Sequence, residues 1–358
     1  MSVMTQHEVA RKLGVSRGTL YRVLTNSPLV GAETCERVRR GLEEFQYTPN
    51  TIAQALKTKR TMAIGVAGPG ASKLANLDKL YEVHQAAAAA GYSVIVGYSN
   101  GSVEEDERCI RELRARMVDG LIVFSRGLRG GARPWHTARA AGHPVVALYP
   151  LPGMGVDCVY VDTRGAFAAL TRHLIGLGHR DIGLLTDCSE SEYTKNRERG
   201  FKDAMRAAGL PVRPEWIVRA RPEGCEPGGG TVSEQRLWLC SDFDLGFQTA
   251  LQAFRAKRRP TAFVCYSDEF AIGALRAADL SGVRIPQEIS LVGYNDSDAA
   301  RYARVPLTTM HQPNRELGRE AVALLLRRME EGASSGRPVV KVVSATLVRR
   351  ESSAPPPR

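Results

Sequence analysis

The chain has 358 residues, of which 43% are hydrophobic and 24% charged, so it is long enough for two or three domains with cores of their own. It contains no apolar run that could span a membrane, and its N-terminus lacks a secretion signal, so we expect a cytoplasmic protein with no membrane partner. The seven cysteines are scattered without a C-x-x-C pair, so we expect neither disulfides nor a metal site, and no cofactor.

The positive charge is concentrated at the N-terminus. Residues 1–60 hold ten Lys and Arg against five Glu, whereas the whole chain carries a net charge of +11. A small basic head on a larger and nearly balanced body indicates that the head binds a polyanion and that the body has another role. A solvated surface rich in Lys and Arg is the alternative explanation of the charge alone.

Residues 1–46 have the pattern of three short helices. Thr5 and Glu8 are spaced as a capping box at the start of the first helix, and Gly14 is suited to end it. Ser16 can cap a second helix, and a third is expected over about 33–45. Two helices joined by a turn that contains glycine, with a polar outer face on the second, predict an all-α helix-turn-helix domain.

Residues 47–60 predict a short additional helix. Pro49 ends the preceding helix, Asn50 can cap a new one, and Ile52, Ala53 and Leu56 would share one face of about two turns. A helix this short is marginal in water on its own. We therefore expect this segment, 47–60, to need a partner in order to form.

From residue 61 the pattern changes to short apolar strands that alternate with amphipathic helices, in two series. This predicts an α/β core, 61–350, of two doubly wound parallel-sheet subdomains that enclose a ligand cleft. We expect the first subdomain to contain about 61–160 and 300–325, and the second about 161–299 and 326–350. The segment 221–241 is interpreted as a lid or a surface excursion, and the tail 351–358 as disordered.

The motifs "VARKLGVSRGTLYRVL", "YTPNTIAQALKTKR", "NRERGF", "SDEFAIGALRAADLSGVRIPQEISLVGYND" and "LTTMHQP" resemble those of the lactose-repressor/purine-repressor family of bacterial transcription regulators. The resemblance runs from residue 4 to about 350 in one order. It implies a helix-turn-helix headpiece, a hinge helix, and a core that resembles periplasmic sugar-binding proteins. It also implies a homodimer that binds double-stranded, pseudo-palindromic operator DNA and responds to a small-molecule effector.

The resemblance also implies which residues bind DNA. In the family, Arg17 and Gly18 hold the positions that read bases most directly and Arg22 is the usual third, while the hinge residues Ala53 and Leu56 enter the minor groove. Leu20-Tyr21 and Gly31 depart from the usual family residues. The complete predicted set of DNA-binding residues is Thr5, Ser16, Arg17, Gly18, Thr19, Tyr21, Arg22, Tyr47, Asn50, Ala53, Leu56 and Lys57.

The effector residues come from the same resemblance. The family's ligand arginine corresponds to Arg197, and the polar residue after "VGY" is Asn295 where relatives often have Asp. Asp162 and Asp268 match family positions at strand ends, with Asp268 equally suited to brace a loop, and Phe243 could stack on a sugar face. His179 corresponds to a structural turn residue in the family.

Three other interpretations are weaker or remain open. A periplasmic sugar-binding protein has no use for residues 1–60, and an oxidoreductase would need a complete dinucleotide fingerprint, which "GVAGPGASK" lacks. We therefore expect a regulator, not an enzyme. A sugar or sugar derivative is the expected effector, with a purine-type corepressor or a phosphocarrier protein as the alternative, and either induction or corepression remains open.

Overall fold

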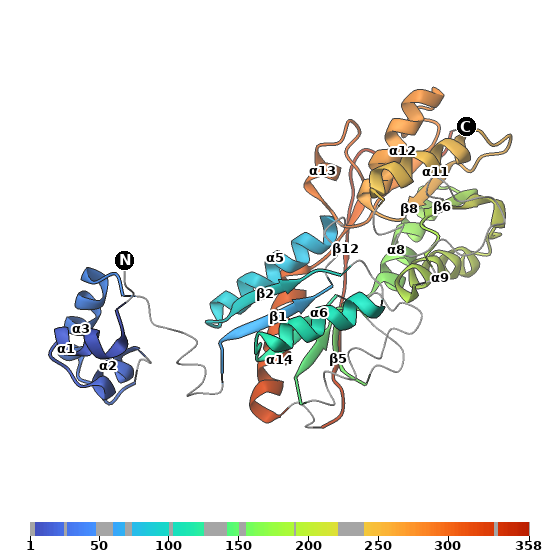
Figure 1. The fold of residues 1–358 in the computed structure, drawn as a ribbon. Coiled ribbons are helices and arrows are strands. Elements are labelled where there is room, and N and C mark those ends of the chain that lie inside the picture. The colour runs from blue at the N-terminus through green and yellow to red at the C-terminus, as the bar shows by residue number, and fades with distance from the viewer. Residues whose placement is uncertain are drawn as a thin grey trace. The chain divides into compact units, whose positions relative to one another are not determined.

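The computed structural model describes residues 4–24, 27–47, 60–68, 74–99, 103–124, 142–149, 155–189, 191–220, 240–332 and 336–357. The chain divides into two compact units, residues 1–61 and 62–358, which we call the headpiece and the core unit (Figure 1). Within the described ranges, no helix combines the length and the apolar character that crossing a membrane requires.

The headpiece contains three helices: α1 (Gln6–Lys12), α2 (Arg17–Leu24) and α3 (Ala32–Glu44). The predicted capping box is confirmed, because the backbone N–H of Thr5 donates to Glu8 at 2.7 Å and that of Glu8 donates to the Thr5 hydroxyl at 3.3 Å. Gly14 follows α1 with φ of +64°, as its predicted role at the helix end requires. The small core consists of Val9, Ala10, Leu20, Val23 and Val38.

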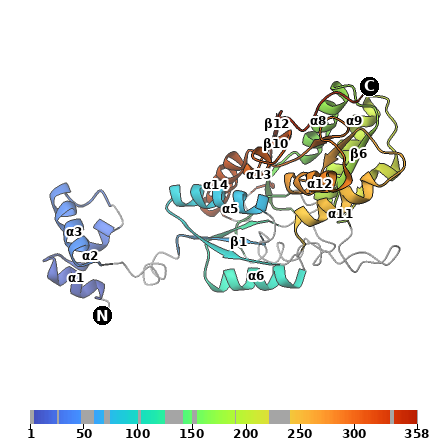
Figure 2. The same ribbon diagram turned by 90° about the horizontal axis from the view of Figure 1, so that it is seen from above.

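The first subdomain of the core unit is a six-stranded parallel sheet in the order β11-β5-β4-β3-β1-β2. Helices α5 and α14 cover one face and α6 covers the other, as Figure 2 shows. The elements are β1 (Ala63–Ala67), α5 (Leu74–Ala89), β2 (Ser93–Gly97), α6 (Val103–Ala115), β3 (Gly120–Val123), β4 (Val145–Ala147), β5 (Asp157–Val161), α14 (Asn314–Glu331) and β11 (Val340–Val343).

The second subdomain is a four-stranded parallel sheet in the order β7-β6-β8-β9, with two helices on each face. The sheet divides the core of this subdomain into two clusters. Hydrophobic side chains of α8 and α9 pack on one face of the sheet, and those of α11 and α12, many of them alanines, pack on the other. The elements are α8 (Thr163–Gly176), β6 (Ile182–Thr186), α9 (Glu192–Ala207), η1 (Pro214–Trp216), β7 (Ile217–Arg219), α11 (Asp242–Phe254), β8 (Ala262–Cys265), α12 (Asp268–Ser281), β9 (Ser290–Val292) and α13 (Asp298–Arg301).

The chain passes between the two subdomains three times, and the later crossings differ from the prediction. We expected 300–325 in the first subdomain and 326–350 in the second. Instead, β10 (Thr309–His311) and β12 (Thr346–Val348) form an antiparallel pair that packs on the second subdomain, while β11 extends the first sheet. The prediction was wrong because a short apolar strand carries no local signal for the sheet edge that it joins.

The C-terminal tail is ordered through residue 357, so the prediction of a disordered tail was wrong. Strand β9 lies at the edge of its sheet, and the tail provides partners for its backbone: Leu291 N–H donates to the Ser352 carbonyl at 2.8 Å, and the Ser352 hydroxyl donates to the Leu291 carbonyl at 2.6 Å. His179, buried as expected of a structural residue, lies 2.8 Å from the Ala354 carbonyl through Nε2.

Helices α8 and α9 approach closely at Gly200. A Cβ placed on Gly200 would lie 2.1 Å from the backbone oxygen of Arg164, whereas a Cβ on Gly176, at the end of α8, would meet nothing within 4 Å. Backbone atoms cannot move aside as the tip of a flexible side chain can. Gly200 therefore sets the distance between α8 and α9.

We expect Gly200→Ala to destabilise the core unit by about 1–3 kcal/mol, because the two helices must separate to admit the methyl group. Gly176→Ala is the matched control and should be neutral or slightly stabilising, since alanine favours a helix over glycine. Urea unfolding of both variants measures the difference. Equal stability of the two variants would show that the contact between α8 and α9 yields easily.

Candidate DNA-binding surface and central cleft

Helix α2 presents its polar side chains on the face opposite its core contacts. Leu20 and Val23 are buried, whereas Arg17, Gly18 and Arg22 are exposed. The Ser16 hydroxyl accepts the backbone N–H of Thr19 at 3.0 Å, which satisfies a free donor at the start of the helix. The N-terminal end of α2 is therefore capped and carries the exposed Arg17, while the exposed Arg22 lies in the last turn of the helix.

The structure describes only some of the remaining predicted DNA-binding residues. Thr5 caps α1, Thr19 and Tyr21 are half-buried, and Tyr47 packs against the headpiece core, where burial raises the pKa of its hydroxyl. The four predicted hinge residues lie outside the described residues: Asn50, Ala53, Leu56 and Lys57. The predicted 221–241 segment also falls almost entirely outside the described part of the chain.

The core unit has a central cleft between its two subdomains. The described lining residues are mostly aromatic, amide or charged, and they come from both sides. The first subdomain contributes Leu74, Ala75, Asn76, Lys79 and Tyr149, and the second contributes Tyr193, Arg197, Asp242, Tyr266, Ser267, Glu269 and Asn295. The free volume between them is about 10 Å³, which is room for about one water molecule. A larger ligand therefore requires the subdomains to separate.

Both hydrogen bonds and aromatic rings hold the side chain of Arg197, on α9, in the cleft. It is 2% exposed, and it donates to the Tyr266 carbonyl at 2.6 Å and to the Tyr193 hydroxyl at 2.5 Å. Its guanidinium carbon also lies over four aromatic rings, at centroid distances of 3.8 Å (Tyr266), 4.1 Å (Tyr193), 4.8 Å (Tyr294) and 5.3 Å (Phe167). These rings offer electrostatic attraction in place of water and fix the direction in which the guanidinium points.

Asn295 links the cleft to the segment between β10 and α14, where the chain passes from the second subdomain back to the first. Its side-chain N–H donates to Glu269 at 3.3 Å, and its side-chain oxygen accepts from Gln312 at 2.5 Å. Asn295 and the following Asp296 both have positive φ, at 137° and 59°, a conformation that is costly for residues other than glycine. The backbone is thus strained at the point where a cleft residue meets the connection to α14.

Three predicted effector residues do not belong to the described lining of the cleft. Asp162 accepts the backbone N–H of Gly165 at 2.8 Å and caps α8. Asp268 is fully buried and accepts from the Thr309 hydroxyl at 2.6 Å and from the Ser297 N–H at 2.8 Å, so it braces the loop after β9. Phe243 lies in the first turn of α11, where the preceding Asp242 lines the cleft.

Sequence reasoning missed most of the lining. Tyr149 lies two residues after β4, and Tyr266 and Ser267 are the first two residues after β8. The carboxyl ends of parallel strands are where ligands bind in such sheets, so these positions could have been inferred. Tyr193 lies one turn before Arg197 on α9, which is also a readable signal. Lys79 lies on α5 at helical spacing from the buried Val83 and Ala87, so its place on the buried face was readable, although a lysine is rarely found there.

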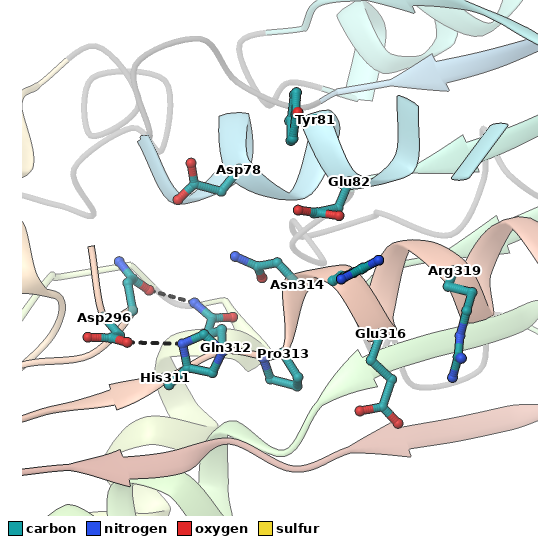
Figure 3. A pocket seen from close by; sticks show the side chains of 12 residues that line it. Asp78, Tyr81, Glu82, Asp296, His311, Gln312, Pro313, Asn314, Glu316 and Arg319 are labelled. Atoms are coloured by element: carbon teal, nitrogen blue, oxygen red, sulfur yellow. Dashed lines mark hydrogen bonds and ion pairs between the residues drawn. The ribbon is translucent and has the colours of Figure 1, made fainter. Parts of the chain in front are cut away.

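A second hollow, which we call the outer groove, lies between α5 and the start of α14 and measures about 660 Å³ (Figure 3). Asp78 and Glu82 on α5 lie across it from Asn314, and His311 is held by Asp296 at 3.0 Å. Its walls include Tyr81, which is 60% exposed, and several exposed charges. The central cleft, though smaller, is the better candidate site because its polar groups are buried and converge.

Burial changes the titration of Glu269, one of the two carboxyl groups in the described lining of the cleft. It is 4% exposed, and burial raises its pKa from 4.5 to about 7, although a hydrogen bond from the Ser267 side chain acts in the opposite direction. Between these two pH values the unfolded chain has lost its proton while the folded protein still holds it. The carboxyl group therefore lowers the stability progressively as the pH rises through this window.

We expect Glu269→Gln to be as stable as the parent near about pH 5 and more stable by up to about 3 kcal/mol near about pH 8, because glutamine keeps the acceptor without the charge. Chemical unfolding of the ligand-free protein at both pH values measures this difference. If the free energies of unfolding of the variant and the parent differed by the same amount at both pH values, the carboxyl group would titrate normally.

Comparisons with known proteins agree with this arrangement of units. A family model described as bacterial regulatory proteins, lacI family, matches residues 5–50. Models of the periplasmic binding proteins and sugar binding domain of LacI family, and of the periplasmic binding protein-like domain, match residues 76–224 and 171–353. The matches cover the headpiece and both subdomains in the order that the sequence motifs indicated.

Similar whole proteins extend these matches over nearly the full chain. The ribose operon repressor of Haemophilus influenzae is 30% identical over 349 residues, covering 97% of this chain and 98% of that protein. The transcriptional repressor PurR of Pectobacterium carotovorum is 30% identical over 359 residues, covering 99% and 98%. The structure of the lac repressor dimer bound to operator and the anti-inducer ONPF has a TM-score of 0.81 at 26% identity, covering 99% of this chain and 100% of that one.

Proposed function

Because the chain belongs to the LacI family of bacterial regulatory proteins, we propose that it is a transcriptional repressor whose operator binding is switched by a small molecule in the central cleft. The observation that carries this proposal is the joint presence of a helix-turn-helix headpiece and a two-subdomain cleft in one chain. The protein acts as a homodimer on double-stranded DNA in the cytoplasm. Like the repressors that it resembles, it is a regulator and not an enzyme.

Helix α2 is the element that reads the operator. Arg17 and Arg22 project from its exposed face, and the planar fork of arginine matches O6 and N7 of guanine in the major groove. Gly18 has no side chain to offer, so base recognition depends on the arginines. The Ser16 and Thr19 hydroxyls lie 2.9 Å apart at the helix start, where phosphate oxygens are bound in such complexes.

The hinge segment supplies the second DNA contact. Ala53 and Leu56 enter the minor groove at the operator centre, where a leucine wedged between base pairs kinks the duplex, and Lys57 binds an adjacent phosphate. This role rests on the sequence resemblance. A helix of two turns forms only when its partner segment and DNA are present, which makes it sensitive to the state of the core unit.

The effector is a sugar or sugar derivative, bound by Arg197 and Asn295 between the two walls of the cleft. Aromatic rings and amide groups around a guanidinium suit the mixed apolar and hydroxyl surface of a sugar. A purine-type corepressor is the second candidate, since several similar proteins are named PurR. Either ligand would favour one degree of cleft closure, which the chain transmits directly from β1 to the hinge segment.

We expect Arg17→Ala to weaken operator binding by about 1–3 kcal/mol and to relax the preference for guanine at one position of each half-site. Fluorescence anisotropy with the operator and with single-base variants measures both effects. Arg206→Ala, which removes an exposed arginine from α9 in the core unit, is the control and should bind as the parent does. A uniform loss over all sequences would instead make Arg17 a phosphate contact.

Arg197→Ala should remove the response of operator binding to the effector, because the guanidinium is the central polar group of the cleft. The ratio of operator affinities with and without effector, expected to correspond to about 1–3 kcal/mol in the parent, should approach one in the variant. Circular dichroism establishes that the variant is folded. A variant that responds normally would place the effector site elsewhere in the chain.

A further inference from the structure

The amino-terminal edge of the second sheet carries a concentration of positive charge. The connections that enter β6, β7, β8 and β9 are residues 177–181, 208–216, 255–261 and 282–289, all of which the structure describes. They hold seven Arg and Lys against three Asp and Glu, which is most of the excess positive charge outside residues 1–60. We call this surface the basic edge, and its cations are Arg180, Arg213, Arg255, Lys257, Arg258, Arg259 and Arg284.

The four connections form one continuous surface. Arg258 links the β8 connection to two others, since its guanidinium carbon lies 5.7 Å from the Trp216 ring centroid and its Nη2 lies 3.9 Å from an Asp181 oxygen. The Ser290 N–H donates to the Thr261 carbonyl at 2.9 Å, which joins the starts of β8 and β9. Neighbouring strands lie about 4.8 Å apart, so the ends of four strands give an edge about 15 Å long.

Only part of this charge is offset within the basic edge. Six of the seven cations are exposed, and the seventh, Arg213, is half-buried. Of the three carboxylates, Asp181 already pairs with Arg258, and Glu288 accepts from Arg284 at 3.2 Å. The remaining like charges repel one another, and a polyanion is the partner that relieves this repulsion.

We propose that the basic edge binds the phosphate backbone of a second DNA duplex while the headpiece holds the operator. DNA carries one charge per about 1.7 Å of helix axis, so an edge about 15 Å long faces several phosphates. Six of the seven cations are arginines, whose planar forks bind phosphate oxygens in pairs. Contacts of this kind hold a duplex without reading its sequence. The inference goes beyond the proposed function, because it adds a second DNA contact to the core unit.

An acidic protein is the competing partner, and the surface favours DNA over it. Protein–protein interfaces have an apolar centre, whereas no large hydrophobic side chain is exposed within these four described connections. Binding through phosphate contacts is electrostatic and needs no such centre. The effector does not compete for this surface, because the cleft residues Tyr266 and Ser267 follow the opposite, carboxyl end of β8.

The test measures whether the full-length protein, already bound to one duplex, captures another. A palindromic duplex is selected from a random library, immobilised and loaded with the protein, and a fluorescent duplex of random sequence is then added. The first duplex occupies both headpieces of the dimer, so a captured second duplex contacts another surface. We expect capture at about 0.05 M salt, with an affinity that falls by about two to four powers of ten for each tenfold rise in salt.

Substitution then assigns the capture to the basic edge. Arg255→Gln with Lys257→Gln leaves Arg258 intact, and it should weaken capture about tenfold or more and reduce the salt dependence by about two powers of ten. Arg108→Gln with Arg116→Gln removes two exposed cations from the first subdomain and should capture as the parent does. Arg255 and Lys257 also follow the C-terminus of α11, where cations stabilise the helix dipole. A purely structural role would therefore lower stability in urea and leave capture unchanged.

The two proposals fail in different ways. If the first duplex is retained but no second duplex is captured at low salt, or if both double variants capture it equally, the basic edge is refuted and the repressor function stands. If poly-L-glutamate binds the loaded protein more tightly than the duplex does, the partner is an acidic protein and not DNA. If no palindromic duplex can be selected, the proposed function itself is refuted, and binding of the random duplex alone to the two double variants still decides the role of the basic edge.

Discussion

The burial of one guanidinium group organises the second subdomain. The four rings around Arg197 come from α8, α9, and the segments that follow β8 and β9, so every one of these elements must be in place for the charge to be accommodated. Gly200 lies one turn after Arg197 and permits the close approach of α8 that brings Phe167 to the guanidinium. A charge without such neighbours would be strongly destabilising in a buried place.

Contacts in the cleft are linked directly to the connections between the two subdomains. Asn295 contacts both Glu269 in the cleft and Gln312 just before α14, and the same short stretch contains two residues with positive φ. Because β10 and β12 pair with each other on the second subdomain while α14 and β11 pack on the first, the connections between them must bend when the subdomains move. Strain at these connections lets a few contacts in the cleft bias a much larger movement.

Much of the molecule could be predicted from local patterns. The capping box at Thr5, the three headpiece helices and the two series of parallel strands follow from the spacing of apolar and capping residues, and the family resemblance identified Arg197 and Asn295, which both lie in the cleft. The wrong predictions concern long-range choices. Strand β11 pairs with β5 in the sheet of the first subdomain, although we expected it in the second. The Pro-rich tail is ordered because the edge strand β9 has backbone groups that Ser352 satisfies.

The amino-acid sequence by itself determined the division into a basic headpiece and an α/β core, because helix caps, periodicity and charge are properties of neighbouring residues. Only the tertiary structure decided that Lys79 and Tyr149 form a wall of the cleft opposite Arg197, and that Asp268 braces a loop outside it. Residues that are distant in sequence meet according to how helices pack and chains cross. Such contacts depend on the shapes of whole elements, which no short stretch of sequence encodes.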